Sequence, residues 1–350
     1  AKSVKTASTQ DKGPISDITN FEQMVQLGRS GKLDANDQHI VHICDWLFNY
    51  AFQQRASDIH LEPRRDVSNV RFRIDGALHQ VYQIPTPVMA AMTSRIKILG
   101  RMDVVEKRRP QDGRLKTVSP DGSEVELRLS TMPTAFGEKF VMRIFDPETL
   151  VKEYRELGFG EDDERKWKQM VGQPHGIVLV TGPTGSGKTT TLYSTLKSLA
   201  TSDVNVCTVE DPIEMVEPSF NQMQVQTAIN VNFASGIRTL MRQDPDIILV
   251  GELRDLETIA IALTAAETGH LVFATLHTQD AAQTIDRIID VFPPHQQQQV
   301  RQQLAMSLQG VVCQTLCKRS DAHGRVVATE VLVVTPAVRN LIREGKTHQI

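Results

Sequence analysis

The hydrophobic positions follow two different patterns along this 350-residue chain. Between residues 36 and 150 they recur at helical spacing and then alternate with polar residues, whereas from residue 151 onward they form short unbroken runs. Residues 1–35 are polar with little periodicity, which indicates a flexible tail or linker. We therefore predict two domains, 36–150 and 151–350, that follow this tail.

The first predicted domain combines helical and alternating patterns, which is typical of a small α+β domain with a largely antiparallel sheet. One amphipathic helix runs from Asp37 towards the segment "ASDIHLEP", where Pro63 stops any continuation. Asp75-Gly76 then marks a hairpin turn, and Gly100 ends a second helix. The predicted core positions of the first helix are Ile40, Ile43, Cys44, Leu47, Phe48 and Ala51.

The second predicted domain contains four short apolar runs that are separated by helical segments. Strands that are buried on both faces have this composition, and helices between such strands indicate a parallel sheet. We therefore predict a doubly wound α/β domain. The four runs are "IVLVT" (177–181), "VCTV" (206–209), "IILV" (247–250) and "LVFAT" (271–275).

The overall composition is that of an ordinary soluble globular protein, with 40% apolar residues, 23% charged residues and a formal net charge of −3. The charge balance shows no basic excess that would suggest a nucleic-acid partner. No apolar run approaches the roughly 20 residues that a membrane-spanning helix needs, and the N-terminal residues do not resemble a signal peptide. The four cysteines suggest a reducing compartment.

Two of the cysteines, Cys313 and Cys317, stand close together as C-x3-C, with His323 nearby. A structural zinc site needs four ligands, and the sequence offers no second pair of cysteines. We interpret this pair as small apolar thiols on a helix. We therefore expect no structural zinc.

The segment "TGPTGSGKTTT" matches the phosphate-binding loop pattern G-x-x-x-x-G-K-[ST] at every fixed position. A predicted strand precedes it and a predicted helix follows it, as this pattern requires. The glycines let backbone amides approach phosphate groups, and the following helix points its positive end at them. Lys188 would reach the β- and γ-phosphates of ATP, and the Thr189 hydroxyl would ligate magnesium. The candidate nucleotide-binding residues are Gly182, Pro183, Thr184, Gly185, Ser186, Gly187, Lys188, Thr189 and Thr190.

Acidic residues stand at the ends of the other predicted strands of the second domain. Ligands of open α/β sheets bind outside the carboxyl ends of the strands. Glu252 is the best candidate to polarise the attacking water, and Glu210 and Asp211 would hold magnesium through its water shell. Glu214 follows them, and Asp246 precedes the third run. Each carboxylate alone can also be a solvated turn residue.

Two histidines, His270 and His277, flank the fourth apolar run. We expect the carboxylates and these histidines to converge on the loop that holds the phosphates. Direct contact with the γ-phosphate and a structural role are both open for each histidine.

Five arginines are candidates for stabilising the transition state of phosphoryl transfer from another domain or subunit. Arg238 and Arg242 lie one turn apart on a predicted helix, which would put both guanidinium groups on one face. Arg128 and Arg143 lie on neighbouring predicted strands of the first domain, and Arg143 interrupts an otherwise apolar run. Arg287 lies in "TIDRIID". A surface salt bridge is the default alternative for each of them.

Taken together, these motifs resemble the secretion ATPase family, which comprises the motors of type II secretion, type IV pilus assembly and pilus retraction. The resemblance extends from Asp37 to Ile350. The segments that carry it are "ASDIHLEP", "RFRIDG", "RRPQDGR", the phosphate-binding loop, "VEDPIE", "RQDPDIILVGELRDLETI" and "TGHLVFATLHT".

The resemblance implies a particular architecture and location. It implies a homo-hexameric, magnesium-dependent ATPase whose subunits have a PAS-like N-terminal domain and a RecA-like C-terminal domain, with ATP between the two. Motors of this family lie at the cytoplasmic face of the inner membrane as peripheral proteins. They dock there on a polytopic platform protein of the pilus or secretion system.

The resemblance also implies roles for individual residues. Glu252 corresponds to the catalytic glutamate of the Walker B motif, and Arg128 and Arg143 correspond to arginine fingers. Arg238, Arg242 and Arg287 correspond to further nucleotide-site or interface arginines. The family's Asp box corresponds to Glu210, Asp211 and Glu214, and its His box includes His270 and His277.

The chain also departs from the family pattern. Assembly and secretion motors usually carry a four-cysteine zinc module, which "CQTLCKRSDAHGRVVATEVL" lacks. This segment and "TPAVRNLIREGKTHQI" are more similar to retraction motors, whereas the first domain is more similar to the assembly and secretion branch. The leading hypothesis is an ATP-hydrolysing motor for pilus assembly or protein secretion. The alternatives are a pilus retraction ATPase, a nucleic-acid-translocating ATPase and a nucleotide-gated scaffold that does not hydrolyse ATP.

Overall fold

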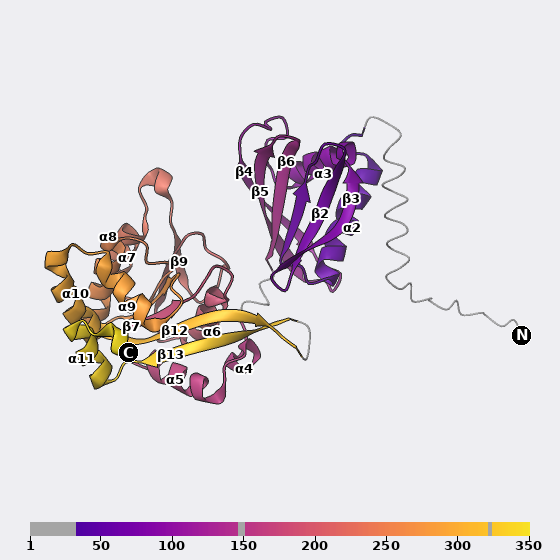
Figure 1. Ribbon diagram of the computed structural model, residues 1–350. Helices are drawn as coiled ribbons and strands as arrows, with labels where there is room; N and C mark the ends of the chain where they lie inside the picture. Colours follow the sequence, from indigo (N-terminus) through magenta and orange to yellow (C-terminus); the bar gives the residue numbers. More distant parts are fainter. Residues whose placement is uncertain (1–32, 146–150, 321–323) are drawn as a thin grey trace, which may run out of the picture. The chain divides into compact units, whose positions relative to one another are not determined.

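The computed structural model describes residues 33–145, 151–320 and 324–350. Most of the predicted tail, residues 1–32, lies outside these ranges, as does His323. The chain divides into two compact units, Ala1–Asp146 and Pro147–Ile350 (Figure 1). No helix within the described ranges combines the length and the apolar character that crossing a bilayer would require.

Unit 1 is a six-stranded antiparallel sheet with two helices, α2 (Gln38–Gln53) and α3 (Thr86–Leu99), packed on one face. The buried residues of α2 are the six that the sequence predicts, so this helix is confirmed. Trp46 of α2 stacks on Tyr50 at the edge of this core. In the spatial order of the sheet, the strands are β3 (Ala77–Pro85), β2 (Val67–Ile74), β1 (Asp58–Glu62), β6 (Gly137–Phe145), β5 (Glu124–Thr134) and β4 (Gln111–Val118).

One segment of unit 1 differs from its prediction. The first helix ends at Gln53, and the following "DIHLE" forms β1, a central strand that pairs with both β2 and β6. Its apolar residues face the helices, while Asp58, His60 and Glu62 lie on the opposite face and are nevertheless buried. With only two apolar residues, Ile59 and Leu61, the alternation is too short to predict a strand on its own. The hairpin at Asp75-Gly76 is confirmed, and both residues have positive φ.

Unit 2 is built on a seven-stranded mixed sheet with the order β13-β12-β7-β11-β10-β8-β9. The four predicted apolar runs are confirmed as four adjacent parallel strands in the middle of this sheet. They are β7 (Gly176–Thr181), β11 (Leu271–Leu276), β10 (Ile247–Val250) and β8 (Val206–Glu210). The remaining strands are β9 (Asn221–Gln224), β12 (Leu308–Lys318) and β13 (Arg325–Val333), of which β9 and β13 lie at the edges.

The strands β12 and β13 form an antiparallel hairpin that the sequence did not predict. Cys313 and Cys317 lie on β12, so the expectation of a helix for this pair is wrong. Cys313 is buried and accepts a hydrogen bond from Thr181 Oγ1 at 3.0 Å, whereas Cys317 is exposed. The β12 strand therefore lies directly against the end of β7, from which the phosphate-binding loop departs.

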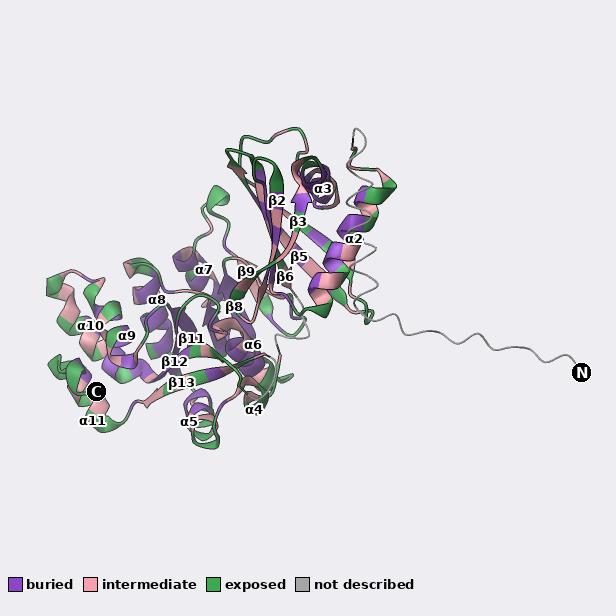
Figure 2. Ribbon diagram, turned by 45° about the vertical axis from the view of Figure 1, so that its right-hand side comes forward, coloured by how far each residue is buried: buried purple, intermediate pink, exposed green. Residues whose placement is uncertain are grey.

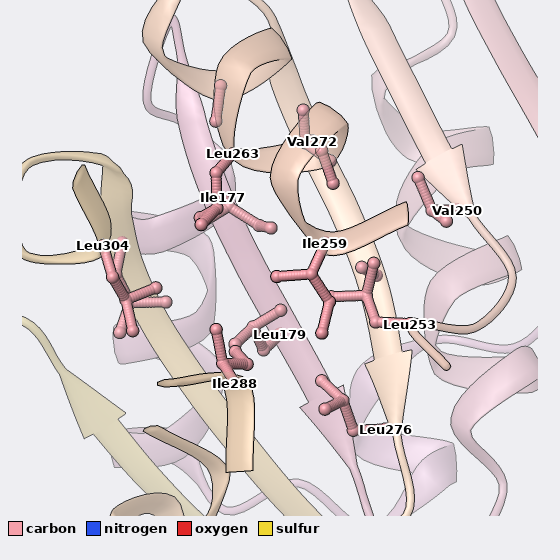
Figure 3. Packing of buried hydrophobic residues seen from close by; sticks show 14 of the residues in the cluster. Ile177, Leu179, Val250, Leu253, Ile259, Leu263, Val272, Leu276, Ile288 and Leu304 are labelled. Atoms are coloured by element: carbon pink, nitrogen blue, oxygen red, sulfur yellow. The ribbon is translucent and has the colours of Figure 1, made fainter. Parts of the chain in front are cut away.

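Helices cover both faces of the central strands, and each face has its own hydrophobic core. On one face, Ile177 and Leu179 of β7 belong to a core that also contains Ile259, Ile288 and Leu304 from the covering helices (Figure 3). On the other, Val178 and Val180 pack against α5 and α6, where Trp167 is fully buried. The helices are α4 (Tyr154–Leu157), α5 (Glu161–Val171), α6 (Lys188–Leu199), α7 (Phe233–Leu240), α8 (Leu256–Glu267), α9 (Ala281–Asp290), α10 (Pro294–Ser307) and α11 (Pro336–Glu344), with short 3-10 turns at Thr227–Ile229 and Thr347–Gln349.

This double burial determines where chemistry can occur in unit 2. Every residue of β7, β8, β10 and β11 is buried, as the purple strands behind the partly green helices of Figure 2 show. An unpaired charge inside such a sheet would cost several kcal/mol. Functional polar groups are therefore confined to the strand ends and to the loops that follow them.

Candidate functional site

The loop between β7 and α6 has the backbone that a phosphate-binding loop requires. Gly182 and Gly187 both adopt positive φ, 136° and 87°, which favours glycine. A Cβ on Gly182 would lie 2.1 Å from the carbonyl oxygen of Gln314. The loop therefore lies closely against β12, and a side chain at its first position would displace it.

The same loop presents several donors to one small region. The helix α6 begins at Lys188, so the N–H groups of its first turn have no partner within the helix and carry its positive dipole end. Ser186 Oγ is buried without a hydrogen-bond partner in the described part of the chain. Gln314 Nε2, on β12, anchors the loop by donating a hydrogen bond to the Ser186 carbonyl at 2.8 Å. These features fit an anion such as a phosphate group.

Lys188 folds back over its own loop. Its Nζ donates to the carbonyl oxygens of Gly182 at 2.7 Å and Pro183 at 3.1 Å, and lies 3.5 Å from His277 Nδ1. Burial lowers the pKa of Lys188 while the nearby Glu252 opposes that shift. The ammonium group is thus held where a phosphate on the loop would meet it.

A continuous set of polar contacts joins the ends of three further strands. His277, after β11, brings its Nε2 to 3.2 Å from Oε1 of Glu252, after β10. The other oxygen of Glu252 accepts from Arg254 Nε at 2.7 Å, and Arg254 Nη1 lies 3.7 Å from Asp211 Oδ2, after β8. Lys188, His277, Glu252 and Asp211, four residues that the sequence singled out, are therefore brought together.

Arg254 was missed by sequence reasoning. It stands two residues after Glu252 in "GELRD", at the same strand end, so the argument that found the glutamate also applies to it. Its guanidinium group lies 5.9 Å from the ring centroid of Phe233, within the range of a cation–π contact. Arg254 thus links the two acidic loops that follow β8 and β10.

A pocket of about 80 Å³ lies beside Thr189. This volume has room for several water molecules. Among the described residues, no three His, Cys, Asp or Glu side chains lie close enough to hold a metal ion directly. A hydroxyl and carboxylates around a wet pocket fit magnesium, which keeps much of its water shell. The polar residues in its lining include Thr189, Glu210, Asp211, Glu214 and Glu252.

Glu210 differs from the other carboxylates of the pocket. It is buried, and its Oε2 accepts a hydrogen bond from Tyr193 Oη at 2.6 Å. Its Oε1 accepts from Thr208 Oγ1 at 2.6 Å and from Gln222 Nε2 at 3.3 Å. Since both oxygens are already engaged, the geometry does not favour the predicted role of Glu210 as a metal ligand.

His270 and Asp246 do not join this cluster. His270 precedes β11, and its Nδ1 lies 2.9 Å from the Ala265 carbonyl oxygen. Asp246 precedes β10 and accepts a hydrogen bond from Asn205 N. At about 3.3 Å per residue, the six-residue strand β11 separates its two ends by roughly 15 to 20 Å. The expected convergence of both histidines on the phosphate-binding loop is therefore wrong for His270.

Two of the candidate arginines, Arg238 and Arg287, lie on helices, and Arg242 follows the end of one. Arg238 of α7 pairs with Glu257 at 2.7 Å. Because α7 ends at Leu240, Arg242 lies beyond it, and the prediction of one shared helix face is wrong. Arg287 is exposed in the last turn of α9, seven residues or about 10 Å along the axis from Asp280, its N-cap.

Arg128 and Arg143 lie directly opposite each other on β5 and β6 in unit 1. The strand registers extend this pair into a row that crosses five strands, on the sheet face opposite α2 and α3. Like charges on neighbouring strands repel, so this row favours an anionic partner. Within the row, Asp58 forms ion pairs with Arg143 and Arg73. Outside the row, Glu126 forms ion pairs with Arg114 and Arg128. The row consists of Arg114, Arg128, Arg143, Asp58 and Arg73, and we call it the arginine row.

Comparison with known proteins places the chain in a family. Residues 34–350 match the family model described as type II/IV secretion system protein. The chain belongs to this family. Relatives of the type II/IV secretion family that match it carry names from both type IV pilus assembly and type II secretion.

The chain is 57% identical over 313 residues to the type IV pilus assembly ATPase TfpB of Acinetobacter baylyi, covering 89% of this chain and 52% of that protein. It is 46% identical over 287 residues to the type II secretion system protein E of Xanthomonas campestris, covering 82% and 49%. The chain spans about half the length of these curated relatives.

Two solved structures share the α/β fold with its mixed sheet. The pilus retraction motor PilT with bound ADP matches with a TM-score of 0.69 and 36% identity, covering 87% of this chain and 86% of that one. The ATPase DotB of Legionella pneumophila matches with a TM-score of 0.72 and 26% identity, covering 87% and 84%.

Proposed function

We propose that this chain hydrolyses ATP and uses the energy to power type IV pilus assembly or type II protein secretion. The observation that carries this proposal is the continuous set of contacts from Lys188 through His277, Glu252 and Arg254 to Asp211, beside a glycine-rich loop that can hold phosphate. The names of the relatives supply the biological context.

We assign the steps of hydrolysis to individual residues. The amides of the loop and of the first turn of α6 bind the phosphates, and the Lys188 ammonium turns from the loop carbonyls to the β- and γ-phosphate oxygens. Glu252 orients the attacking water and accepts its proton. His277 and Arg254 each hold one oxygen of Glu252, which fixes the orientation of that carboxylate.

Magnesium fits beside Thr189, whose hydroxyl would ligate it while Asp211 contacts its water shell. When bound, the ion neutralises charge that develops on the phosphates. Glu210 serves as a buried anchor for the strand end, since its oxygens are engaged by Tyr193 and Thr208.

We propose that Arg128 and Arg143 act as arginine fingers that stabilise the transition state. In this proposal residues 36–150 form a PAS-like domain and residues 151–350 a RecA-like ATPase domain. The motor is a homo-hexamer at the cytoplasmic face of the inner membrane, where it docks on a platform protein. The arginine row supports the proposal because its repulsion is relieved by an anion.

The decisive experiment compares Glu252→Gln with Glu267→Gln in purified protein. Glu267 is exposed at the far end of α8 from the pocket and is a matched control. We expect Glu252→Gln to lower the rate of phosphate release about 10²- to 10⁴-fold while ATP still binds. Glu267→Gln should leave the rate unchanged. Persistent hydrolysis in Glu252→Gln would contradict the assignment.

Pilus retraction is the second candidate, because the PilT retraction motor resembles this chain over 87% of its length. The two functions differ in the phenotype of cells that lack the protein. Loss of an assembly motor abolishes surface pili, whereas loss of a retraction motor leaves pili that cannot shorten. Intact pili together with unimpaired protein secretion would favour retraction.

A further inference from the structure

The segment that follows β8, residues 211–217, carries Asp211 and Glu214 into the pocket lining, and we call it the acidic loop. The segment contains no helix or strand, so side chains from its neighbours must hold it. Gln222 of β9 supplies two of these contacts. Its Oε1 accepts from the Glu217 amide at 2.7 Å, and its Nε2 donates to the Met215 carbonyl at 2.9 Å.

A side chain of the phosphate-binding helix contacts the same carbonyl of the acidic loop. Tyr193, on the second turn of α6, directs its hydroxyl to Glu210 Oε2 at 2.6 Å and lies 3.2 Å from the Met215 carbonyl oxygen. Gln222 Nε2 donates to the same hydroxyl at 3.0 Å. Burial and then the charge of Glu210 raise the pKa of Tyr193, so the phenol remains a donor at neutral pH.

These contacts form one closed network at the edge of the pocket. Tyr193 and Gln222 bond each other, and both bond Glu210 and the Met215 carbonyl. Tyr193 is 1% exposed and Glu210 is 4% exposed, so the network is shielded from water. In such a buried environment hydrogen bonds are stronger, and the loss of one partner costs more free energy. The network connects the helix that would hold phosphate to the loop that would meet the metal.

We propose that Tyr193 and Gln222 are positioning residues that hold the acidic loop against α6, so that Asp211 and Glu214 face the space beside Thr189. The inference rests on the proposed function, because it assigns these residues to the magnesium-dependent part of nucleotide binding. Neither residue belongs to the phosphate-binding loop. Their loss therefore leaves binding of the bare nucleotide intact and removes the gain that magnesium provides.

The test compares Tyr193→Phe with Tyr154→Phe by calorimetric titration with a non-hydrolysable ATP analogue, with and without magnesium. Tyr154 is a matched control, since its hydroxyl also donates to α6, to Thr195 at 3.1 Å, but does not contact the acidic loop. We expect Tyr193→Phe to reduce the magnesium-dependent gain in affinity about ten- to a hundredfold, the effect of one lost hydrogen bond to a charged group. Binding without magnesium should change less than about twofold, and the magnesium concentration for half-maximal hydrolysis should rise.

A second variant, Gln222→Leu, tests whether the network acts as a unit. We expect it to reproduce the effect of Tyr193→Phe, and we expect the double variant to lose little more than either single one. Equal magnesium gains in Tyr193→Phe and the unaltered chain would overturn the inference, as would an equal loss of affinity with and without magnesium. Absence of nucleotide binding by the unaltered chain would instead contradict the proposed function as well.

Discussion

In unit 2 the charged groups of interest lie at the ends of strands, whereas in unit 1 they form a row across one face of the sheet. The difference follows from the helices. Helices pack on both faces of the parallel strands in unit 2, so Glu252 and His277 follow the last residues of β10 and β11. In unit 1 α2 and α3 pack on one face, and the arginine row lies on the other.

The comparison shows how topology selects the kind of charge cluster. Loops after parallel strands bring different side chains together, so an acid, a histidine and an arginine meet at one edge. Neighbouring antiparallel strands align residues in rows, which favours repetition of one residue type across several strands. The first arrangement suits proton transfer, and the second suits neutralisation of an extended anion.

The largest effect is expected in the arginine row. Arg143→Gln should lower the turnover of ATP about 10³- to 10⁵-fold if the row supplies the arginine finger. Arg55→Gln is the control, because Arg55 is also exposed and pairs with an acid, Asp75, outside the row. Steady-state phosphate release measures both. Equal ATPase activities for the two variants would show that Arg143 does not contribute to catalysis.

A buried ion pair beneath the opposite face of unit 1 gives the next effect. Lys97 of α3 is 1% exposed, bonds Glu138 of β6 at 2.5 Å and donates to the Glu106 carbonyl at 2.7 Å. Lys97→Met leaves the Glu138 carboxylate buried without its partner and should cost about 3 to 5 kcal/mol of unit 1 stability.

Hydrogen exchange of unit 1 peptides measures this loss separately from unit 2. The double variant Lys97→Met/Glu138→Leu should recover most of the stability, because it removes both charges. A single variant as stable as the unaltered chain would show that the carboxyl group is protonated or hydrated there.

A smaller effect is expected when one acid of the arginine row is neutralised. Asp58 is buried and pairs with Arg143 at 3.0 Å and with Arg73 at 3.8 Å. Asp58→Asn should cost unit 1 about 1 to 2 kcal/mol, and millimolar inorganic phosphate should restore part of it by binding the freed guanidinium groups. Hydrogen exchange with phosphate and with an equal ionic strength of chloride separates binding from screening.

The smallest effect concerns pH. Burial and then Lys139 lower the pKa of His60 in the folded chain, although Asp58 and Glu62 oppose this, while Arg73 adds to it. The unfolded chain therefore binds the proton more readily, and unit 1 should lose stability as pH falls below about 6.5. His60→Gln should remove this component of the pH dependence between pH 7.5 and 5.5. An unchanged slope in that variant would assign the titration to another group.

Many helices and strands of both units could be predicted, because buried positions recur periodically in the sequence. The six core positions of α2 and the four apolar runs of unit 2 are examples. The strand β1 could not be predicted in this way. Its polar residues Asp58, His60 and Glu62 are buried by side chains of neighbouring strands, and the order of residues along the chain does not show those contacts.

The candidate site could likewise be predicted in part. The loop and the residues after strands were found from spacing alone, and Lys188, Glu252 and His277 meet as expected. Tyr193 and Gln222 were missed, because each resembles an ordinary helix or strand residue until the fold brings it to Glu210. His270 was misplaced because strand direction had not been considered.

Each unit contains one of the two tryptophans of the chain, Trp46 in unit 1 and Trp167 in unit 2. Trp46 is partly exposed beside Tyr50, whereas Trp167 is fully enclosed and donates from Nε1 to Thr195 at 3.1 Å. The two indoles therefore provide separate fluorescence reporters, with the enclosed one emitting at shorter wavelength. Tryptophan fluorescence can therefore show which of the two units unfolds first.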